Sequence, residues 1–260
     1  MPQSAKIFAI FSICFGLSCQ GKRATPEKTI EKKETEISQK TPVFNGVIDT
    51  LKEADIPKPF YHKNLHHAYS WADADGTHLL FFYISKPQLE KSPKYMEDEK
   101  RVDFKAVQYV QQADTFKLEW TAIDGVQNCA FDMWLEVFEK SISVTDLDSN
   151  GVAEVSFMYS LACRSDVSPS NIKLLMYEKG QKMALRGYAF LEIAGAKMNK
   201  GNFEPDISKI KFESPLEIGD SRHWGRFENA NDFKTKPKIF LEYSRKKWLE
   251  FITKDQFQQF

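Results

Sequence analysis

The chain carries no excess charge of either sign, because 36 basic residues balance 36 acidic ones. It therefore lacks the basic stripe that binds nucleic acid and the polybasic segment that binds anionic lipid. It also lacks a glycine-rich phosphate loop, a dinucleotide-binding fingerprint and a G-x-S-x-G nucleophile motif. We expect no nucleic-acid partner, and no motif indicates a reaction.

Long hydrophobic runs are also scarce. The longest, residues 7–17, follows Lys6 and is shorter than the ~20 residues of a transmembrane helix. A positive residue followed by such a run is typical of a secretory signal, so residues 1–18 are predicted to be a signal peptide. Small residues before Cys19 resemble a lipoprotein signal, which predicts that Cys19 is lipidated. The alternative is ordinary signal-peptidase cleavage near Gly21 or Ala24.

The segment after Cys19 has almost no residues that could be buried. Residues 19–42 are rich in Lys, Glu, Thr, Ser and Gln. Such a composition cannot offset the entropy of ordering, so we expect a disordered tether between an acyl anchor and a folded body. The expected location is the cell envelope, at the outer membrane, with the membrane as a partner through the acyl chain. Residues 43–260 are then predicted to form a single β-rich globular domain.

Cysteine is rare, with four copies in the chain. Cys14 lies in the predicted signal and Cys19 is the predicted lipid site. This leaves Cys129 and Cys163, an even pair that is expected to form a disulfide in an oxidising compartment. The bridge would also brace both flanks of the acidic segment at residues 146–154. Two free buried thiols are the alternative.

Short apolar segments between Asp, Asn and Gly turns predict strands. A turn at residues 73–76 precedes the first, and Asp124-Gly125 is read as another turn. Residues 133–144 fit both a helix and a strand, and we predict a strand. The predicted strands cover residues 77–85, 104–110, 115–123, 133–144, 152–161, 172–177 and 183–190. The fold class is mainly β (α+β), an antiparallel sheet, sandwich or propeller-like fragment.

The C-terminal third predicts a helix at about residues 237–253. Pro237 suits its first turn, and one face would carry Phe240, Ser244, Trp248, Phe251 and Ile252. We expect this amphipathic helix to pack on the sheet. Use of the same face by a partner protein is the alternative.

An acidic loop, residues 146–154, is the most informative feature of the chain. Asp146, Asp148, Asn150 and Glu154 stand at positions one, three, five and nine, and a glycine stands at six. Oxygen ligands at alternate positions around a glycine turn suit a hard cation, so Ca²⁺ is the expected cofactor. Val152 is expected to add its backbone carbonyl. The alternative is an Asx-rich hairpin turn without metal.

This loop is not an EF-hand, because its twelfth residue is Phe157 where an EF-hand has a bidentate Glu. With Glu154 at position nine and a strand directly after it, the loop resembles the calcium loops of integrin-type FG-GAP and VCBS β-repeats. It occurs once, whereas repeat arrays carry several copies.

Several short motifs together resemble a family of exported Gram-negative lipoproteins labelled surface polysaccharide biosynthesis proteins. The motifs are Trp71-Ala-Asp73-x-x-Gly76, Trp120-x-x-x-Asp124, Cys129-Ala-Phe-Asp132, the acidic loop, Cys163-Arg-Ser-Asp-Val-Ser-Pro169 and Met183-Ala-Leu-Arg-Gly187. The resemblance implies an envelope role in making or displaying surface polysaccharide. It transfers no catalytic residue to this chain.

Two functional hypotheses follow. The first is a non-enzymatic envelope lipoprotein that binds or scaffolds surface polysaccharide or its assembly machinery, with Trp71, Trp224 or Tyr61 stacking on sugars. The second is a periplasmic hydrolase or transferase acting on polysaccharide. That enzyme would need acids such as Asp124, Asp132 and Asp166 in one cleft.

Overall fold

The computed structural model describes residues 44–91, 99–192, 198–199, 201–217 and 220–254. The predicted signal peptide, the lipid site Cys19 and the tether lie outside the described residues. Within these ranges no helix is both long and apolar enough to cross a membrane.

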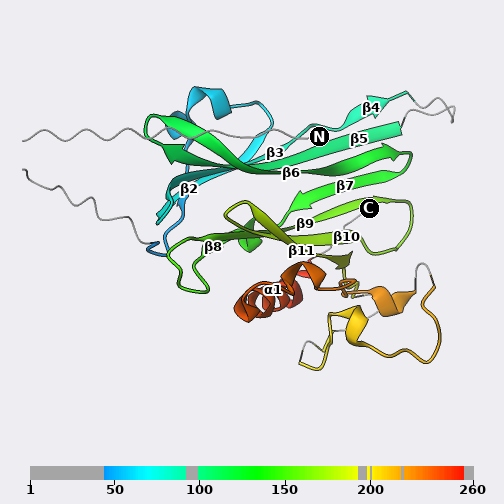
Figure 1. The fold of residues 1–260 in the computed structure, drawn as a ribbon. Helices are drawn as coiled ribbons and strands as arrows, with labels where there is room; N and C mark the ends of the chain where they lie inside the picture. The colour runs from blue at the N-terminus through cyan, green and yellow to red at the C-terminus, as the bar shows by residue number, and fades with distance from the viewer. Residues whose placement is uncertain (1–43, 92–98, 193–197, 200, 218–219, 255–260) are drawn as a thin grey trace, which may run out of the picture. The chain divides into compact units, whose positions relative to one another are not determined.

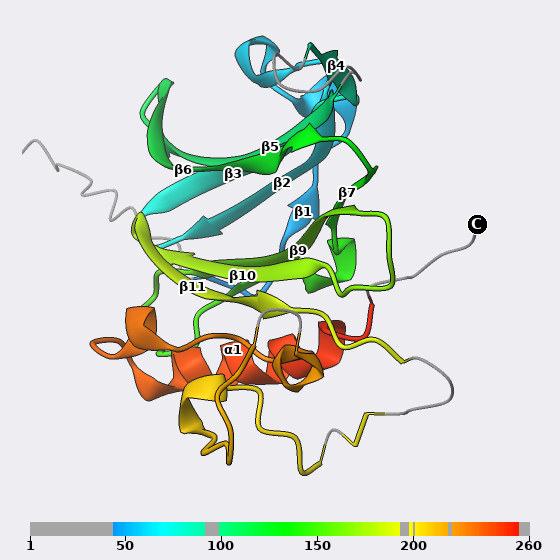
Figure 2. The same cartoon turned by 90° about the vertical axis from the view of Figure 1, so that its right-hand side faces the viewer.

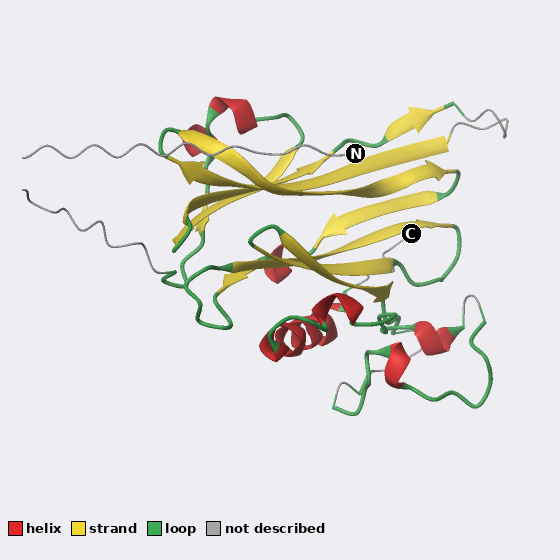
Figure 3. Ribbon diagram, viewed as in Figure 1, coloured by secondary structure: helices red, strands yellow, loops and turns green. Residues whose placement is uncertain are grey.

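The predicted mainly β, antiparallel fold is confirmed. Two sheets face each other, and a helix covers the outer side of one of them (Figures 1 and 3). The first sheet has the order β1-β2-β3-β5-β4, with β6 also paired to β5. Its strands are β1 (Asp49–Thr50), β2 (Leu65–Asp73), β3 (Gly76–Ile84), β4 (Gln88–Glu90), β5 (Glu99–Gln112) and β6 (Thr115–Cys129).

The second sheet has the order β11-β10-β9-β7, and β8 also pairs with β9. Strand β9 is its central strand and is buried along most of its length. The strands are β7 (Asp132–Val137), β8 (Ser143–Thr145), β9 (Glu154–Arg164), β10 (Asn171–Glu178) and β11 (Gln181–Tyr188). Short turns join the antiparallel pairs β2–β3, β5–β6 and β10–β11.

Aromatic side chains fill the space between the two sheets. Phe82 on β3 meets Phe157 on β9 with ring centroids 5.0 Å apart, and Trp120 stacks on Tyr177 at 3.9 Å. Phe82, Phe104 and Phe157 are fully buried. Large rings that alternate along strands of both sheets thus supply the apolar area that holds the sandwich together.

The predicted C-terminal helix is present as α1 (Lys238–Phe251), which lies across the outer face of the second sheet (Figure 2). All five residues of its predicted apolar face are buried. Lys247 is buried too, and its Nζ donates to Ser141 O at 2.5 Å and to Ser156 Oγ on β9 at 2.9 Å. Burial lowers the pKa of Lys247 to about 7. Six short 3-10 helices cover Glu53–Asp55, Lys58–Phe60, Glu139–Ser141, Ile207–Lys209, Ser221–His223 and Asn231–Phe233 among the described residues.

Two local predictions are wrong. Asp124-Gly125 is not a turn but lies inside β6, where Phe104 and Asp103 on β5 are their partners. A Cβ on Gly125 would lie 2.4 Å from the carbonyl oxygen of Val102, so the glycine permits close strand approach. Residues 133–144 are not one strand either, because the chain leaves β7 at Val137, makes a 3-10 turn and returns as β8.

Candidate metal centre

The acidic loop joins β8 to β9, two antiparallel strands in which Thr145 pairs with Glu154. This pairing brings the first and last acidic positions of the loop together. Ser149 and Gly151 take positive φ values of 59° and 84°, which turn the chain within a few residues. The glycine of the predicted motif therefore stands at a position that requires left-handed backbone.

Three of the five predicted ligand residues converge. Asp146, Asp148 and Glu154 each offer a carboxylate oxygen, and these oxygens lie within 4.8 Å of one another. Glu154 is 0% exposed. Three carboxylates this close repel one another in a partly buried site, so the arrangement favours a positive charge between them.

Two of the three carboxylates each have one oxygen that accepts no hydrogen bond from a described residue. Glu154 Oε2 accepts from Thr145 Oγ1 and Leu147 N, both at 3.0 Å. Asp146 Oδ2 accepts from Gly151 N at 3.1 Å. Glu154 Oε1 and Asp146 Oδ1 are buried and accept no hydrogen bond from any described residue. A buried acceptor without a partner costs ~1–3 kcal/mol, a cost that a bound cation would remove.

The other two predicted ligands serve the turn itself. Asn150 Oδ1 accepts from Val152 N at 2.8 Å. The Asn150 amide nitrogen donates to Asp148 Oδ2 at 3.2 Å and to Glu178 Oε1 at 2.7 Å. Asn150 and Val152 thus shape the loop around the three carboxylates.

Burial raises the pKa of Glu154 from its ordinary 4.5 to about 7. The hydrogen bonds from Leu147 N and Thr145 act in the opposite direction but are outweighed, and the charge on Asp148 adds to the rise. A carboxyl that is reluctant to ionise in this way becomes an anionic ligand once a cation compensates its charge.

The loop packs on the turn between β2 and β3. Ala74 N donates to Gly151 O at 2.8 Å, and Ala153 N donates to Asp73 Oδ2 at 3.0 Å. Asp73 Oδ1 lies 2.9 Å from Nε2 of His78, and both side chains are 1% exposed. The acidic loop of the second sheet is therefore anchored to the first sheet through a buried carboxylate.

The sequence predicted residues 73–76 only as the turn that precedes a strand. Its role as the docking partner of the loop depends on contacts between residues about 80 positions apart, such as Asp73 and Ala153. The sequence signal for this contact was an Asp at the end of one strand and a His near the start of the next. Burial alone would lower the pKa of His78, but hydrogen bonds to Asp73 and Glu119 outweigh it and raise the pKa to about 9.

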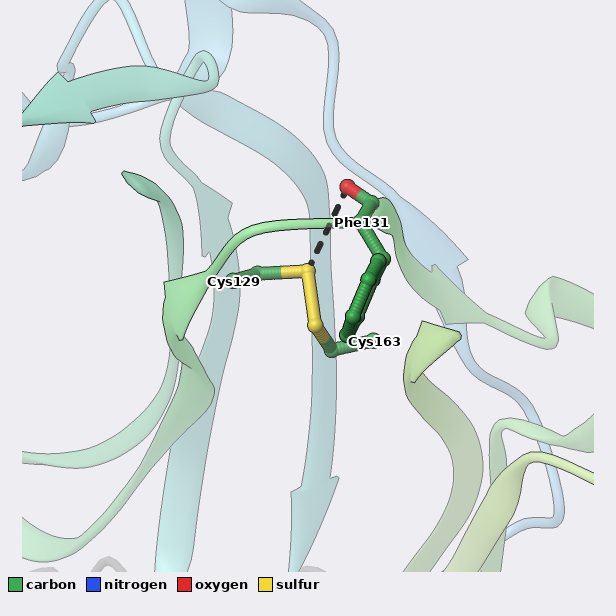
Figure 4. Close-up of a disulfide and its surroundings, with 3 residues drawn as sticks. All are labelled: Cys129, Phe131 and Cys163. Carbon is green, nitrogen blue, oxygen red and sulfur yellow. Dashed lines mark hydrogen bonds between the residues drawn. A yellow bond between two sulfur atoms is a disulfide. The ribbon is translucent and has the colours of Figure 1, made fainter. Parts of the chain in front are cut away.

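The predicted disulfide between Cys129 and Cys163 is confirmed, with the two Cα atoms 5.6 Å apart. It joins the end of β6 to β9 and so ties the two sheets together (Figure 4). Cys129 Sγ lies 3.4 Å from Phe131 O. The bridge does not flank the acidic loop in space, because nine residues of extended β9 separate Cys163 from Glu154, roughly 30 Å.

The acids named for a hydrolytic cleft do not converge. Asp124 accepts from Tyr159 Oη at 2.7 Å and from Lys173 Nζ at 2.5 Å. Asp132 is exposed at the start of β7, and Asp166 is exposed and accepts from Ser168 N at 2.9 Å. Among the described residues, the acidic loop is the one place where three potential metal ligands gather.

The three aromatic residues named for sugar stacking lie in three different surroundings. Trp71 is 3% exposed and stacks on His78, so that expectation is wrong for Trp71. Tyr61 is 49% exposed and lines a pocket on the first sheet, whereas Trp224 lines a pocket at the end of the second.

Comparisons with known proteins give no match to a protein-family model, a curated protein or a solved structure. The geometry of the chain itself therefore carries the functional argument.

Proposed function

We propose that this protein is a non-enzymatic, lipid-anchored protein of the cell envelope, whose sandwich is braced by Ca²⁺ and which binds or scaffolds surface polysaccharide or its assembly machinery. One observation carries the metal part of the proposal. Glu154 Oε1 and Asp146 Oδ1 are buried without a hydrogen-bond donor among the described residues, and a third carboxylate lies beside them.

The ligand chemistry favours Ca²⁺ over other cations. All candidate ligands are oxygens, which excludes a thiolate or imidazole set of the kind that selects zinc. Mg²⁺ demands near-ideal octahedral geometry, whereas Ca²⁺ accepts irregular sets of carboxylates and carbonyls. Asp146, Asp148 and Glu154 supply the charge, and Asn150 and Val152 complete the proposed set.

The place of the loop gives the cation a structural role. Because the loop bonds to Ala74 and Asp73, a cation that rigidifies it also stabilises the contact between the two sheets. The Cys129–Cys163 disulfide supports an oxidising compartment. The envelope role and the polysaccharide partner rest on the family resemblance and on the predicted lipid site at Cys19.

Thermal unfolding of the oxidised protein, first in excess EDTA and then in millimolar Ca²⁺, tests the metal site. Extracellular-type sites bind Ca²⁺ at ~10⁻⁴–10⁻³ M, so 1 mM Ca²⁺ is about one to ten times the dissociation constant and adds ~0.4–1.4 kcal/mol to the free energy of unfolding. Asp148→Asn should abolish this gain. Asp114→Asn, which changes an exposed acid in the β5–β6 turn, is the matched control and should keep it.

An unchanged melting temperature of the unmutated protein in Ca²⁺ would reduce the loop to an ordinary turn. The envelope part is tested separately by labelling cells with a fatty-acid probe. The label and the membrane association should both be lost in Cys19→Ser, and a labelled Cys19→Ser protein would refute the anchor.

A further inference from the structure

A pocket of about 490 Å³ lies at the end of the second sheet that carries the disulfide. Its walls come from the end of β9, the β9–β10 connection, the first residue of β10, the last residue of β11 and the segment that carries Leu216, Glu217, Asp220, His223 and Trp224. The residues that matter for the argument are Arg164, Asn171, Tyr188, Glu217, His223 and Trp224.

The frame of this pocket is fixed by bonds around it. Cys163, which lines it, is held by the disulfide. Arg164 Nη1 donates to Ser168 O at 2.5 Å and so closes the β9–β10 connection. Tyr188 N donates to Arg226 O at 3.1 Å, and Gly225 N donates to Ala189 O at 2.9 Å. These two bonds fix the backbone that carries Tyr188 and Trp224, so the pocket is preformed.

Two aromatic rings supply flat apolar surface within the pocket. Tyr188 is 36% exposed, and Trp224 is half-buried. The ring of His223 meets Tyr188 edge-on, with centroids 6.0 Å apart. Tyr and Trp offer a rigid apolar face together with a polar edge, a combination that suits a ligand with both C–H faces and hydroxyl groups.

The pocket on the first sheet differs in this respect. There two of the lining rings, Phe60 and Tyr109, pack on each other at 4.5 Å, and Phe60 also packs on the buried Phe81 beneath the pocket at 5.2 Å. Its exposed ring is Tyr61. This contrast favours the pocket at the disulfide end as the ligand site.

Polar groups around the two rings are planar and balanced in charge. Asn171 and Glu217 are exposed and offer an amide and a carboxylate, which can engage neighbouring hydroxyls in pairs. The positive charge of Arg164 offsets that of Glu217, and Asp220 is paired with Arg222. A site without excess positive charge does not favour a phosphate, whereas it fits an uncharged polyhydroxyl ligand.

We infer that this pocket binds a neutral oligosaccharide, with Tyr188 and Trp224 stacking on pyranose faces and Asn171 and Glu217 bonding ring hydroxyls. The inference rests on the proposed function, to which it adds a ligand class and a location. Its distance from the acidic loop makes the two sites separable by experiment.

The test titrates the intact, oxidised protein with cellohexaose and with chitohexaose, followed by calorimetry and tryptophan fluorescence. At least one of the two should bind, and Trp224→Ala and Tyr188→Ala should each abolish binding. Asn171→Ala should weaken it about tenfold, the loss expected for one hydrogen bond. Tyr61→Ala removes an exposed ring from the other pocket and is the matched control that should bind normally.

The Ca²⁺-dependent melting shift checks that each variant is folded, because it reads the opposite end of β9. Binding that persists in both Trp224→Ala and Tyr188→Ala would overturn the inference, as would failure of both oligosaccharides to bind the unmutated protein. A parallel pull-down uses isolated surface polysaccharide. If that polymer binds the unmutated protein and Trp224→Ala equally, the pocket is wrong and the proposed function stands; if it binds neither, the proposed polysaccharide partner fails.

Discussion

The two ends of β9 are secured by different chemistry. At Cys163 the strand is joined to the first sheet by a covalent bond to Cys129. At Glu154 no covalent bond joins it to the first sheet: Ala153 N donates to Asp73, and Ala153 and Val155 pack in the shared core, beside two buried oxygens without a donor among the described residues. One end is closed by a covalent bond, whereas the stability of the other should depend on the proposed cation.

The two ends should therefore contribute to stability in different ways, one independent of the medium and one dependent on it. A disulfide acts mainly by restricting the unfolded chain, so its contribution is independent of dissolved ions. A cation site adds stability only when the ion is present, by an amount that grows with the logarithm of its concentration once that exceeds the dissociation constant. The protein should therefore keep its pocket end ordered while the loop end responds to the medium.

Removal of the disulfide at one end of β9 has the largest expected effect on stability. Cys129→Ala/Cys163→Ala opens a loop with a sequence separation of 34. The free energy of unfolding should fall by ~3–4 kcal/mol, measured by urea denaturation without reductant. The melting shift caused by Ca²⁺ should survive, and its loss would show that the two ends of β9 do not act independently.

At the conditional end, Glu154 makes stability depend on pH. Its pKa is about 7 in the folded protein against an ordinary 4.5. The folded state therefore keeps a proton that the unfolded state loses, and in EDTA stability should fall as pH rises from 4.5 to 7 by up to about 3 kcal/mol. Denaturation at several pH values should show this fall relative to Glu154→Gln, which has no carboxyl to titrate. Ca²⁺ should flatten or reverse the trend, and an identical pH profile for the two proteins would contradict the assignment.

In the middle of β9 we expect an intermediate effect on the free energy of unfolding. There Tyr159 donates to Asp124 on β6 at 2.7 Å. Asp124→Ala leaves the buried hydroxyl without this acceptor, which should cost about 1–2 kcal/mol. Tyr159→Phe/Asp124→Ala should cost less than the sum of the two single changes in chemical denaturation. Additive losses would mean that the pair contributes nothing beyond packing.

The smallest effect is expected at the rim of the acidic loop. Asp75 and Lys179 form an exposed ion pair at 3.9 Å. Asp75→Asn should change the free energy of unfolding by less than about 0.5 kcal/mol, because water screens such pairs. The Ca²⁺ response should also be kept. A large loss of that response would show that general negative charge, rather than the three converging carboxylates, attracts the cation.

The sequence predicted those features that are encoded locally. Short apolar segments between turn residues located β3, β9 and β10, and the helical spacing of Phe240, Ser244 and Trp248 located α1 with its buried face. The spacing of Asp146, Asp148 and Glu154 predicted that these acids converge, and the cysteine count predicted the disulfide.

Features that arise from pairing between distant segments were not predictable in this way. Gly125 looks like a turn residue, but β5 runs alongside it and keeps the strand extended. Trp71 looks like a surface ring until the stacking with His78 and the second sheet bury it. The pocket proposed to bind sugar likewise joins Tyr188 to Trp224, residues that the pairing of β11 with the following segment brings together.

The buried His78 gives the molecule an optical property. Its ring lies nearly parallel to the indole of Trp71, with centroids 5.0 Å apart and an interplanar angle of 6°. A stacked imidazolium quenches indole emission, and the pKa of about 9 keeps His78 charged at neutral pH. The carboxylate that holds this proton, Asp73, also accepts from Ala153, the neighbour of Glu154. Trp71 is thus an intrinsic fluorophore whose brightness should rise, without any label, when His78 loses its proton near pH 9.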